Sequence, residues 1–144
     1  MLYDFFKDIF SSVEFLATFF GVLIAFLLNY AYSFFRDNKT YKNLKKSIAA
    51  ELENNLKRYE YDYSAISFET FKRINGHPIF SQKCTEKLEG DLWDVYGRLR
   101  VLKDKVEDYN RRGSLLHQDR DNEIKNFTEK YKSKLEQLIK DLKK

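Results

Sequence analysis

The sequence is poor in the residues that break helices or build covalent and metal sites. Its 144 residues include one proline, one cysteine, two histidines and five glycines. Cys84 has no second cysteine to pair with, which is typical of a chain in a reducing compartment. Because His77, His117 and Cys84 lack the spacing of metal ligands and no glycine-rich phosphate loop is present, we expect neither a metal nor another cofactor.

Charge is missing from one long stretch, Phe15 to Phe35, although a third of the chain is Asp, Glu, Lys or Arg. A helix of this length, rising about 1.5 Å per residue, crosses a hydrocarbon core of roughly 30 Å. A cleaved signal peptide is the alternative, but it has a shorter apolar part and a basic front, whereas the charges before Phe15 are mostly acidic. The sequence therefore predicts an extracytoplasmic stub at 1–12, a single membrane helix at 13–35 and a domain at 36–144.

Basic residues are distributed unequally around this stretch. Lys7 is the only base before it, whereas a basic cluster follows it closely: Arg36, Lys39, Lys42, Lys45 and Lys46. Because basic flanks stay on the cytoplasmic side, we predict a bacterial inner-membrane protein with a cytoplasmic carboxy terminus. The domain is basic but also holds many acids, so its charge is better explained by a nearby anionic leaflet than by RNA binding.

Apolar residues after the membrane segment recur every three or four positions, and no strand-like alternation appears. The clearest break is Gly76-His77-Pro78, and weaker ones lie at Arg112-Gly113 and around Asp119. We expect a first helix that runs unbroken from the membrane to about residue 63, then helices over about 65–75, 82–109 and 115–143. An interruption near Asp119 is the alternative for the last of these helices. The predicted fold class is all-α, a single-pass helix followed by a small helical bundle that self-association would stabilise.

The periodic positions predict the core of this bundle. They are Leu44, Ile48, Leu52, Leu56, Tyr59 and Tyr63; Phe68, Phe71 and Ile74; Leu88, Leu92, Val95, Leu99, Leu102 and Val106; and Ile124, Phe127, Tyr131, Leu135, Leu138 and Leu142. Trp93 and Tyr96 are also expected at core positions, packing there rather than forming a platform for nucleic-acid bases.

The predicted membrane helix carries small or polar residues at steps of four: Ala17, Gly21, Ala25, Asn29 and Ser33. Small residues let helix backbones approach closely in lipid, and a polar side chain there prefers a partner to lipid. We therefore expect this face to form a homo-oligomer, the alternative being a chance spacing of common residues.

Two polar residues follow the basic cluster at helical spacing. Glu51 and Asn55 are four positions apart and share a helix face. Either they hydrogen-bond a neighbouring helix and set its register, or they lie on a solvated face, and the sequence favours neither.

An arginine and a histidine near the end of the chain are separated by four residues in the segment Arg112-Gly-Ser-Leu-Leu-His117, and Arg111 is an alternate arginine. This spacing is similar to the R-x4-6-H motif of HEPN domains, small helical bundles in which paired protomers cleave RNA with these side chains. The resemblance implies proton transfer by His117 and stabilisation of phosphate charge by Arg112. HEPN nucleases often have a small polar residue after the arginine, and here Arg112 or Gly113 follows instead, so we favour a chain that is not an enzyme.

The overall layout resembles one group of bacterial membrane proteins. It combines the apolar GVLIAFLLN segment, the E-L-x-x-N-L element from Glu51 to Leu56, the L-x3-Y-x-R-L element from Leu92 to Leu99 and the late R-x4-H motif. It is similar to the membrane accessory proteins of type VI-B RNA-targeting CRISPR systems. The resemblance implies a homo-oligomeric pore used in antiphage defence, with an RNA-guided effector as a partner.

Three functions follow from these observations. The first is a homo-oligomer that perturbs the inner membrane in antiphage defence. The second is a membrane-tethered ribonuclease of HEPN type. The third is a passive anchor whose bundle binds another protein.

Overall fold

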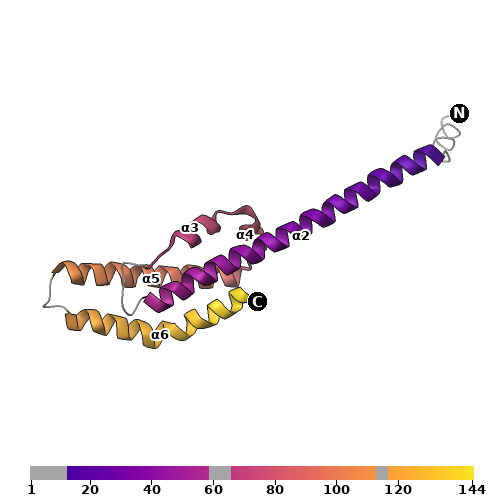
Figure 1. The fold of residues 1–144 in the computed structure, drawn as a ribbon. Coiled ribbons are helices and arrows are strands. Elements are labelled where there is room, and N and C mark those ends of the chain that lie inside the picture. Colours follow the sequence, from indigo (N-terminus) through magenta and orange to yellow (C-terminus); the bar gives the residue numbers. More distant parts are fainter. Residues whose placement is uncertain (1–12, 59–65, 113–116) are drawn as a thin grey trace. The chain divides into compact units, whose positions relative to one another are not determined.

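The structure, a computed structural model, describes residues 13–58 and 66–112, the backbone of 117–120, and residues 121–144 in full. Five helices make up the described secondary structure (Figure 1): α2 (Val13–Arg58), α3 (Glu69–Asn75), α4 (Pro78–Lys83), α5 (Glu86–Arg112) and α6 (His117–Lys143). The prediction of an all-α chain is confirmed for these residues. The stub at 1–12, the core positions Tyr59 and Tyr63, and the break at Gly113 lie outside them.

The chain forms two compact units, Met1–Lys39 and Thr40–Lys144. Helix α2 is common to both, because it continues without a break from Val13 to Arg58. The prediction of one helix from the apolar segment into the bundle is therefore confirmed as far as Arg58. The first unit, where it is described, consists of this helix alone, whereas the second also contains α3, α4, α5 and α6.

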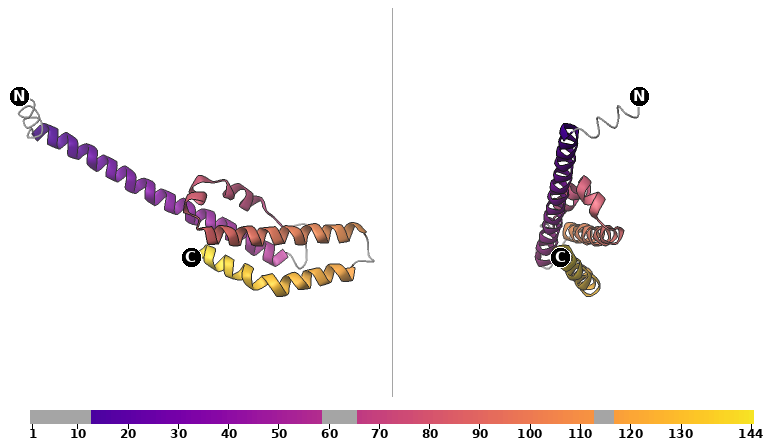
Figure 2. Two further views of the ribbon diagram at one scale, coloured as in Figure 1. Left: turned by 180° about the vertical axis from the view of Figure 1, so that it is seen from behind. Right: turned by 90° about the vertical axis from the view of Figure 1, so that its right-hand side faces the viewer.

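The second unit has one apolar core. Helices α5 and α6 lie side by side in both views of Figure 2, and residues from every helix of the unit contribute buried side chains. Buried core residues include Ile48, Ala49 and Leu52 of α2, Phe71 and Ile74 of α3, Phe80 of α4, Leu92, Val95, Tyr96, Leu99, Leu102 and Val106 of α5, and Phe127, Leu135, Leu138, Ile139 and Leu142 of α6. The remaining described positions of the predicted stripes, such as Leu44, Leu88 and Tyr131, pack against this core half-buried.

The predicted break at Gly76-His77-Pro78 is confirmed, since α3 ends at Asn75 and α4 begins at Pro78, a first helical position at which a proline costs no backbone hydrogen bond. The structure adds the short helix α4 before the expected helix over 82–109, which is α5 and runs from Glu86 to Arg112. The alternative of an interruption near Asp119 is wrong, since α6 runs continuously from His117 to Lys143.

The prediction of a core position for Trp93 is wrong as well. Its side chain is 52% exposed and meets the ring of Phe71 in a T-shaped contact at 5.1 Å between centroids. Tyr96, by contrast, is buried and stacks on Phe71 at 4.2 Å, as expected of a core aromatic residue.

Candidate functional site

The apolar segment of α2 is the first candidate site. The described chain contains one helix long and apolar enough to cross a membrane, and it lies near the amino terminus. No part of its apolar window is buried against the rest of the protein. A core helix of a soluble protein would bury such a window, so this segment requires another apolar environment.

The face of small residues on this segment is open. Ala17, Gly21, Ala25 and Asn29 are exposed and Ser33 is half-buried. A methyl group added at Gly21 would meet no atom within 4 Å, so nothing in a single chain requires a glycine there. The role of this face in self-association remains a prediction.

The basic cluster after the segment is mostly exposed. Arg36 pairs with Asp37 at 3.4 Å, and Lys45 lies over the ring of Tyr41 at 5.4 Å from its centroid. The other three members, Lys39, Lys42 and Lys46, extend into solvent on α2. These side chains are accessible to an anionic surface, as their predicted position beside lipid headgroups requires.

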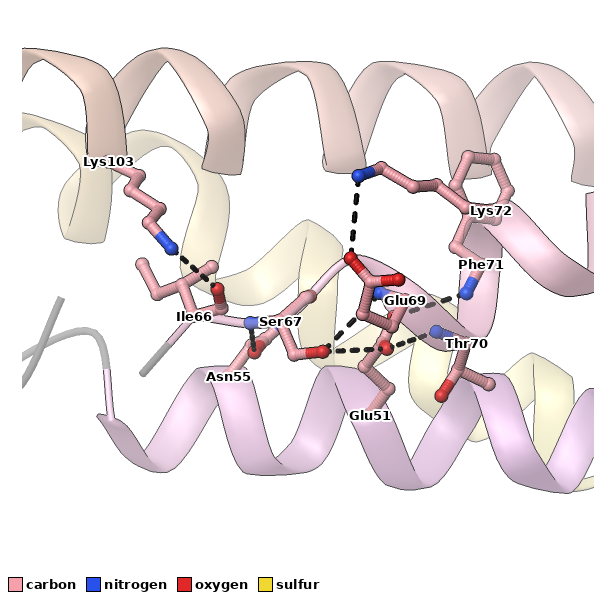
Figure 3. A network of polar contacts seen from close by, with 9 residues as sticks. All are labelled: Glu51, Asn55, Ile66, Ser67, Glu69, Thr70, Phe71, Lys72 and Lys103. Carbon is pink, nitrogen blue, oxygen red and sulfur yellow. Dashed lines mark hydrogen bonds and ion pairs between the residues drawn. The ribbon is translucent and has the colours of Figure 1, made fainter. Parts of the chain in front are cut away.

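The second candidate site is a buried carboxylate on the same helix. Glu51 is only 6% exposed, and Figure 3 shows it beside the start of α3. It accepts hydrogen bonds from the backbone N–H of Thr70 at 2.7 Å and of Phe71 at 3.3 Å. The residue before α3 is Phe68, which makes no side-chain cap. Glu51 therefore caps α3 from another helix, where orphan N–H groups and the helix dipole favour a negative charge.

Two hydroxyl groups complete the hydrogen bonding of this carboxylate. The Ser67 Oγ donates to Glu51 at 3.1 Å and the Tyr96 phenol donates to it at 2.8 Å. Burial, together with the charge of Glu51 and this hydrogen bond, raises the pKa of Tyr96 far above its ordinary value. One carboxylate thus joins α2, α3 and α5 through four donors.

Asn55 holds the segment that leads into α3. It is 1% exposed, its amide donates to the carbonyl of Ser67 at 2.8 Å, and its oxygen accepts from the N–H of Ser67 at 2.9 Å. Lys103 of α5 donates to the carbonyl of Ile66 at 3.1 Å (Figure 3). Of the two interpretations of Glu51 and Asn55, the solvated face is wrong and the contact that sets a neighbouring helix is confirmed.

Sequence reasoning misses the partners in this network. The sequence predicts only packing for Tyr96, and Ser67 carries no signal at all. Ser67 reaches Glu51 because the chain folds back over α2, which no local spacing reveals. The four-residue spacing of Glu51 and Asn55 does indicate that both face the same way.

The arginine and histidine motif straddles the connection between α5 and α6. Arg112 pairs with Asp108 at 2.7 Å, and Arg111 lies 3.9 Å from Glu107. In each pair the two residues are one turn apart on α5, and both pairs are exposed to solvent. The side chain of His117 lies outside the described residues, so the structure does not test whether it meets either arginine.

Other reactive groups are isolated. The described residues contain no group of three or more His, Cys, Asp or Glu that could hold a metal ion. Burial and the nearby Glu89 raise the pKa of the Cys84 thiol, which disfavours the reactive thiolate.

Comparison with protein-family models, curated proteins and solved structures finds no match to this chain. The resemblance to HEPN domains and to CRISPR membrane accessory proteins therefore stays a prediction. Functional inference accordingly depends on the residues described above.

Proposed function

We propose that this chain is a single-pass protein of the bacterial inner membrane that forms homo-oligomers and perturbs the membrane as an accessory of antiphage defence. The observation that carries the proposal is the exposed apolar segment of α2, which has no apolar partner in its own chain. Lipid can cover most of that surface, and a second copy can cover the face from Ala17 to Ser33. The link to an RNA-guided effector comes from the sequence resemblance.

The continuity of α2 supports a role in transmitting a signal. The same unbroken helix carries the apolar segment and the core residues Ile48 and Leu52. Glu51 and Asn55 attach α3 to this helix through hydrogen bonds at a buried site. A partner that moved α3 would therefore act directly on the helix that enters the membrane.

The first test compares two leucine substitutions in the apolar segment. Gly21→Leu places a bulky side chain on the face of small residues and should weaken self-association, since such contacts contribute about 0.5–2 kcal/mol each. Val22→Leu is the matched control, because Val22 lies on α2 outside that face and is already 66% exposed. Oligomer size in mild detergent is the measurement. An unchanged size for Gly21→Leu would show that this face is not the interface.

The second test concerns the membrane itself. The protein should resist extraction by alkaline carbonate, and a reporter fused after Lys144 should indicate a cytoplasmic end. Expression of the wild-type chain should collapse the membrane potential of cells, while the Gly21→Leu variant should do so less. A wild-type chain that assembles without any change in the potential would favour the passive anchor.

The ribonuclease function is tested separately. Purified wild-type protein and the Arg112→Ala, His117→Ala double variant are incubated with structured and unstructured RNA in the absence of divalent metal. We expect no cleavage by either, since Arg112 is paired with a carboxylate of its own helix at 2.7 Å. Cleavage by the wild type that vanishes in the double variant, at unchanged oligomer size, would replace the proposed function with a ribonuclease.

A further inference from the structure

The outer face of α5 is the apolar surface that the described part of the bundle leaves open. Among the described residues from Thr40 onward, the large apolar side chains that are exposed are Trp93 at 52% and Val101 at 55%. They lie four residues on either side of Gly97, on the same face of the helix. An exposed pair of this kind around a glycine forms a shallow saddle on the helix surface.

Gly97 is the low point of this saddle. A methyl group added there would meet no atom within 4 Å, so the bundle itself does not require a glycine. A glycine inside a helix costs about 1 kcal/mol relative to alanine. The missing side chain does let another backbone approach α5 closely.

Two clefts flank α5. One has a volume of about 530 Å³ and lies beside α3, with Phe68, Phe71 and Trp93 among its lining residues. The other has a volume of about 300 Å³ and lies beside α6, with Val101, Phe127 and Tyr131 in its lining. Gly97 lines both. Side chains of a helix laid across Gly97 would therefore find room on either side.

The charges of α5 indicate which helix would lie across Gly97. Between Glu86 and Tyr96 the helix has four acids and one base, whereas between Arg98 and Lys105 it has four bases and one acid. Gly97 separates these halves. A second α5 running in the opposite direction would place each half beside the oppositely charged half of its partner.

Individual positions agree with this arrangement. In an antiparallel pair that crosses at Gly97, residues equally far before and after it face each other, so Trp93 meets Val101 of the second copy. The charged flanking pairs are Asp94 with Arg100, Glu89 with Lys105 and Lys87 with Glu107, and each pair joins opposite charges. Asp94 and Lys105 also pair within their own chain, with Lys134 at 2.9 Å and Glu123 at 2.7 Å, so Lys87 with Glu107 is the pair that a second copy would change most. Glu86 and Asp108, three turns from the crossing, would repel each other and mark where the helices diverge.

We infer that the outer face of α5 binds the same face of a second copy of this chain, antiparallel and centred on Gly97. The contact is isologous, so every favourable pair occurs twice. Anchoring both copies in one membrane raises their effective concentration, which lets a small contact of this kind form. To this extent the inference rests on the proposed function, although the contact itself is separate from the apolar segment.

The test uses the full-length chain in membranes, with Cys84 replaced by serine. The double variant Lys87→Cys, Glu107→Cys should give cross-linked dimers with a short bifunctional maleimide, because residue 87 of one copy faces residue 107 of the other. The two positions are about 30 Å apart within one α5, too far for the linker to join them in one chain. Each single variant alone should give no cross-linked dimer; cross-linked dimers from the single variants would indicate a parallel pair and overturn the inference.

Adding Gly97→Leu to the cysteine pair should abolish the cross-link, since leucine fills the saddle. Leucine is a better helix former than glycine, so a loss cannot be ascribed to unfolding of α5, and circular dichroism checks this. Asn110→Leu is the control: its side chain is exposed on α5 and lies away from the face of Trp93, Gly97 and Val101, so its cross-link should persist.

Two outcomes separate this inference from the proposed function. Oligomers that persist in detergent while the cysteine pair never cross-links would overturn the α5 contact and leave the membrane oligomer standing. If the cysteine pair cross-links and Gly21→Leu leaves the oligomer size unchanged, the α5 contact is supported and the face from Ala17 to Ser33 is not the interface. The charge exchange Lys87→Glu, Glu107→Lys, read by oligomer size, should restore an association that Lys87→Glu alone weakens.

Discussion

The first and second units of the chain use similar apolar residues in opposite ways. Leu23 in the apolar segment is 40% exposed, whereas Leu52, on the same helix, is fully buried. Buried polar groups likewise occur in the bundle, where Glu51 and Asn55 have partners within the chain. The comparison teaches that the bundle holds its structure through its own contacts, while the apolar segment is not buried by any part of the chain that the structure describes.

Two leucine truncations would break this comparison most directly. Leu52→Ala should lower the free energy of unfolding of the bundle by about 2–5 kcal/mol, because it leaves a cavity in a packed core. Leu23→Ala should leave that quantity unchanged. Urea unfolding in detergent, followed by the fluorescence of the single Trp93 against Phe71, is the measurement. Equal effects of both substitutions would contradict the division.

Two neighbouring asparagines of α2 test whether the hydrogen bonds of the bundle stabilise it. Asn55→Ala should cost about 1–3 kcal/mol, since it leaves the backbone N–H and carbonyl of Ser67 without their partners. Asn54→Ala, on the exposed side of the same helix, should change stability by less than about 0.5 kcal/mol. Similar losses for the two variants would mean that the network does not hold α3.

Alkaline titration examines the same network through Tyr96. Its pKa is raised in the folded bundle, so the phenol stays protonated there while the unfolded chain loses its proton above about pH 10. The contribution of Tyr96 to stability is thus present below about pH 10 and falls as the pH rises, by up to about 1.4 kcal/mol per pH unit. Tyr96→Phe should remove this part of the alkaline loss in urea unfolding between about pH 9 and about pH 11.

The smallest expected effect is at the surface between α5 and α6. Asp94 accepts hydrogen bonds from Arg98 at 2.7 Å and Lys134 at 2.9 Å, and the bond from Lys134 contributes most to lowering its pKa. The lowered pKa stabilises the bundle above about pH 4, and the gain is lost as pH falls below that value. Asp94→Asn should lower the free energy of unfolding by at most about 1 kcal/mol near neutral pH. It should also reduce the loss of stability that urea unfolding records below about pH 4.

The control for that prediction is Asp104→Asn. Its carboxylate is 68% exposed and lies 4.0 Å from Arg100, so its removal should have no measurable effect. If both variants behaved alike, the ion pairs of α5 would contribute nothing specific to the stability of the bundle.

Much of the fold follows from the periodicity of apolar residues. The stripes of α5 and α6 correctly predict that Leu92, Leu99, Leu135 and Leu142 lie in the core, because one helical face must be buried. The same reasoning misplaces Trp93, which shares the helix with core residues and contacts Phe71 of α3 but is still 52% exposed. Whether a residue at the border of a stripe is covered depends on how far the neighbouring helix extends.

The candidate sites are predictable to different extents. The apolar segment is predictable from local hydropathy, whereas its orientation and the role of the face from Ala17 to Ser33 stay predictions. The capping of α3 by Glu51 is not predictable, since it joins residues that are 19 and 20 positions apart. The saddle at Gly97 is hidden too, because a glycine within a helix shows its use only when its surroundings are known.

The sequence by itself determined that the chain is helical, that one helix is suited to a membrane, and which faces of the later helices are apolar. These properties depend on residues within a few turns of one another, where the geometry of the helix is known in advance. The tertiary structure alone decided that Glu51 is a buried cap, that Tyr96 and Ser67 donate to it, and that Trp93, Gly97 and Val101 form one open surface. Such features depend on which distant segments cover a residue, because burial and hydrogen bonding are properties of the packed chain.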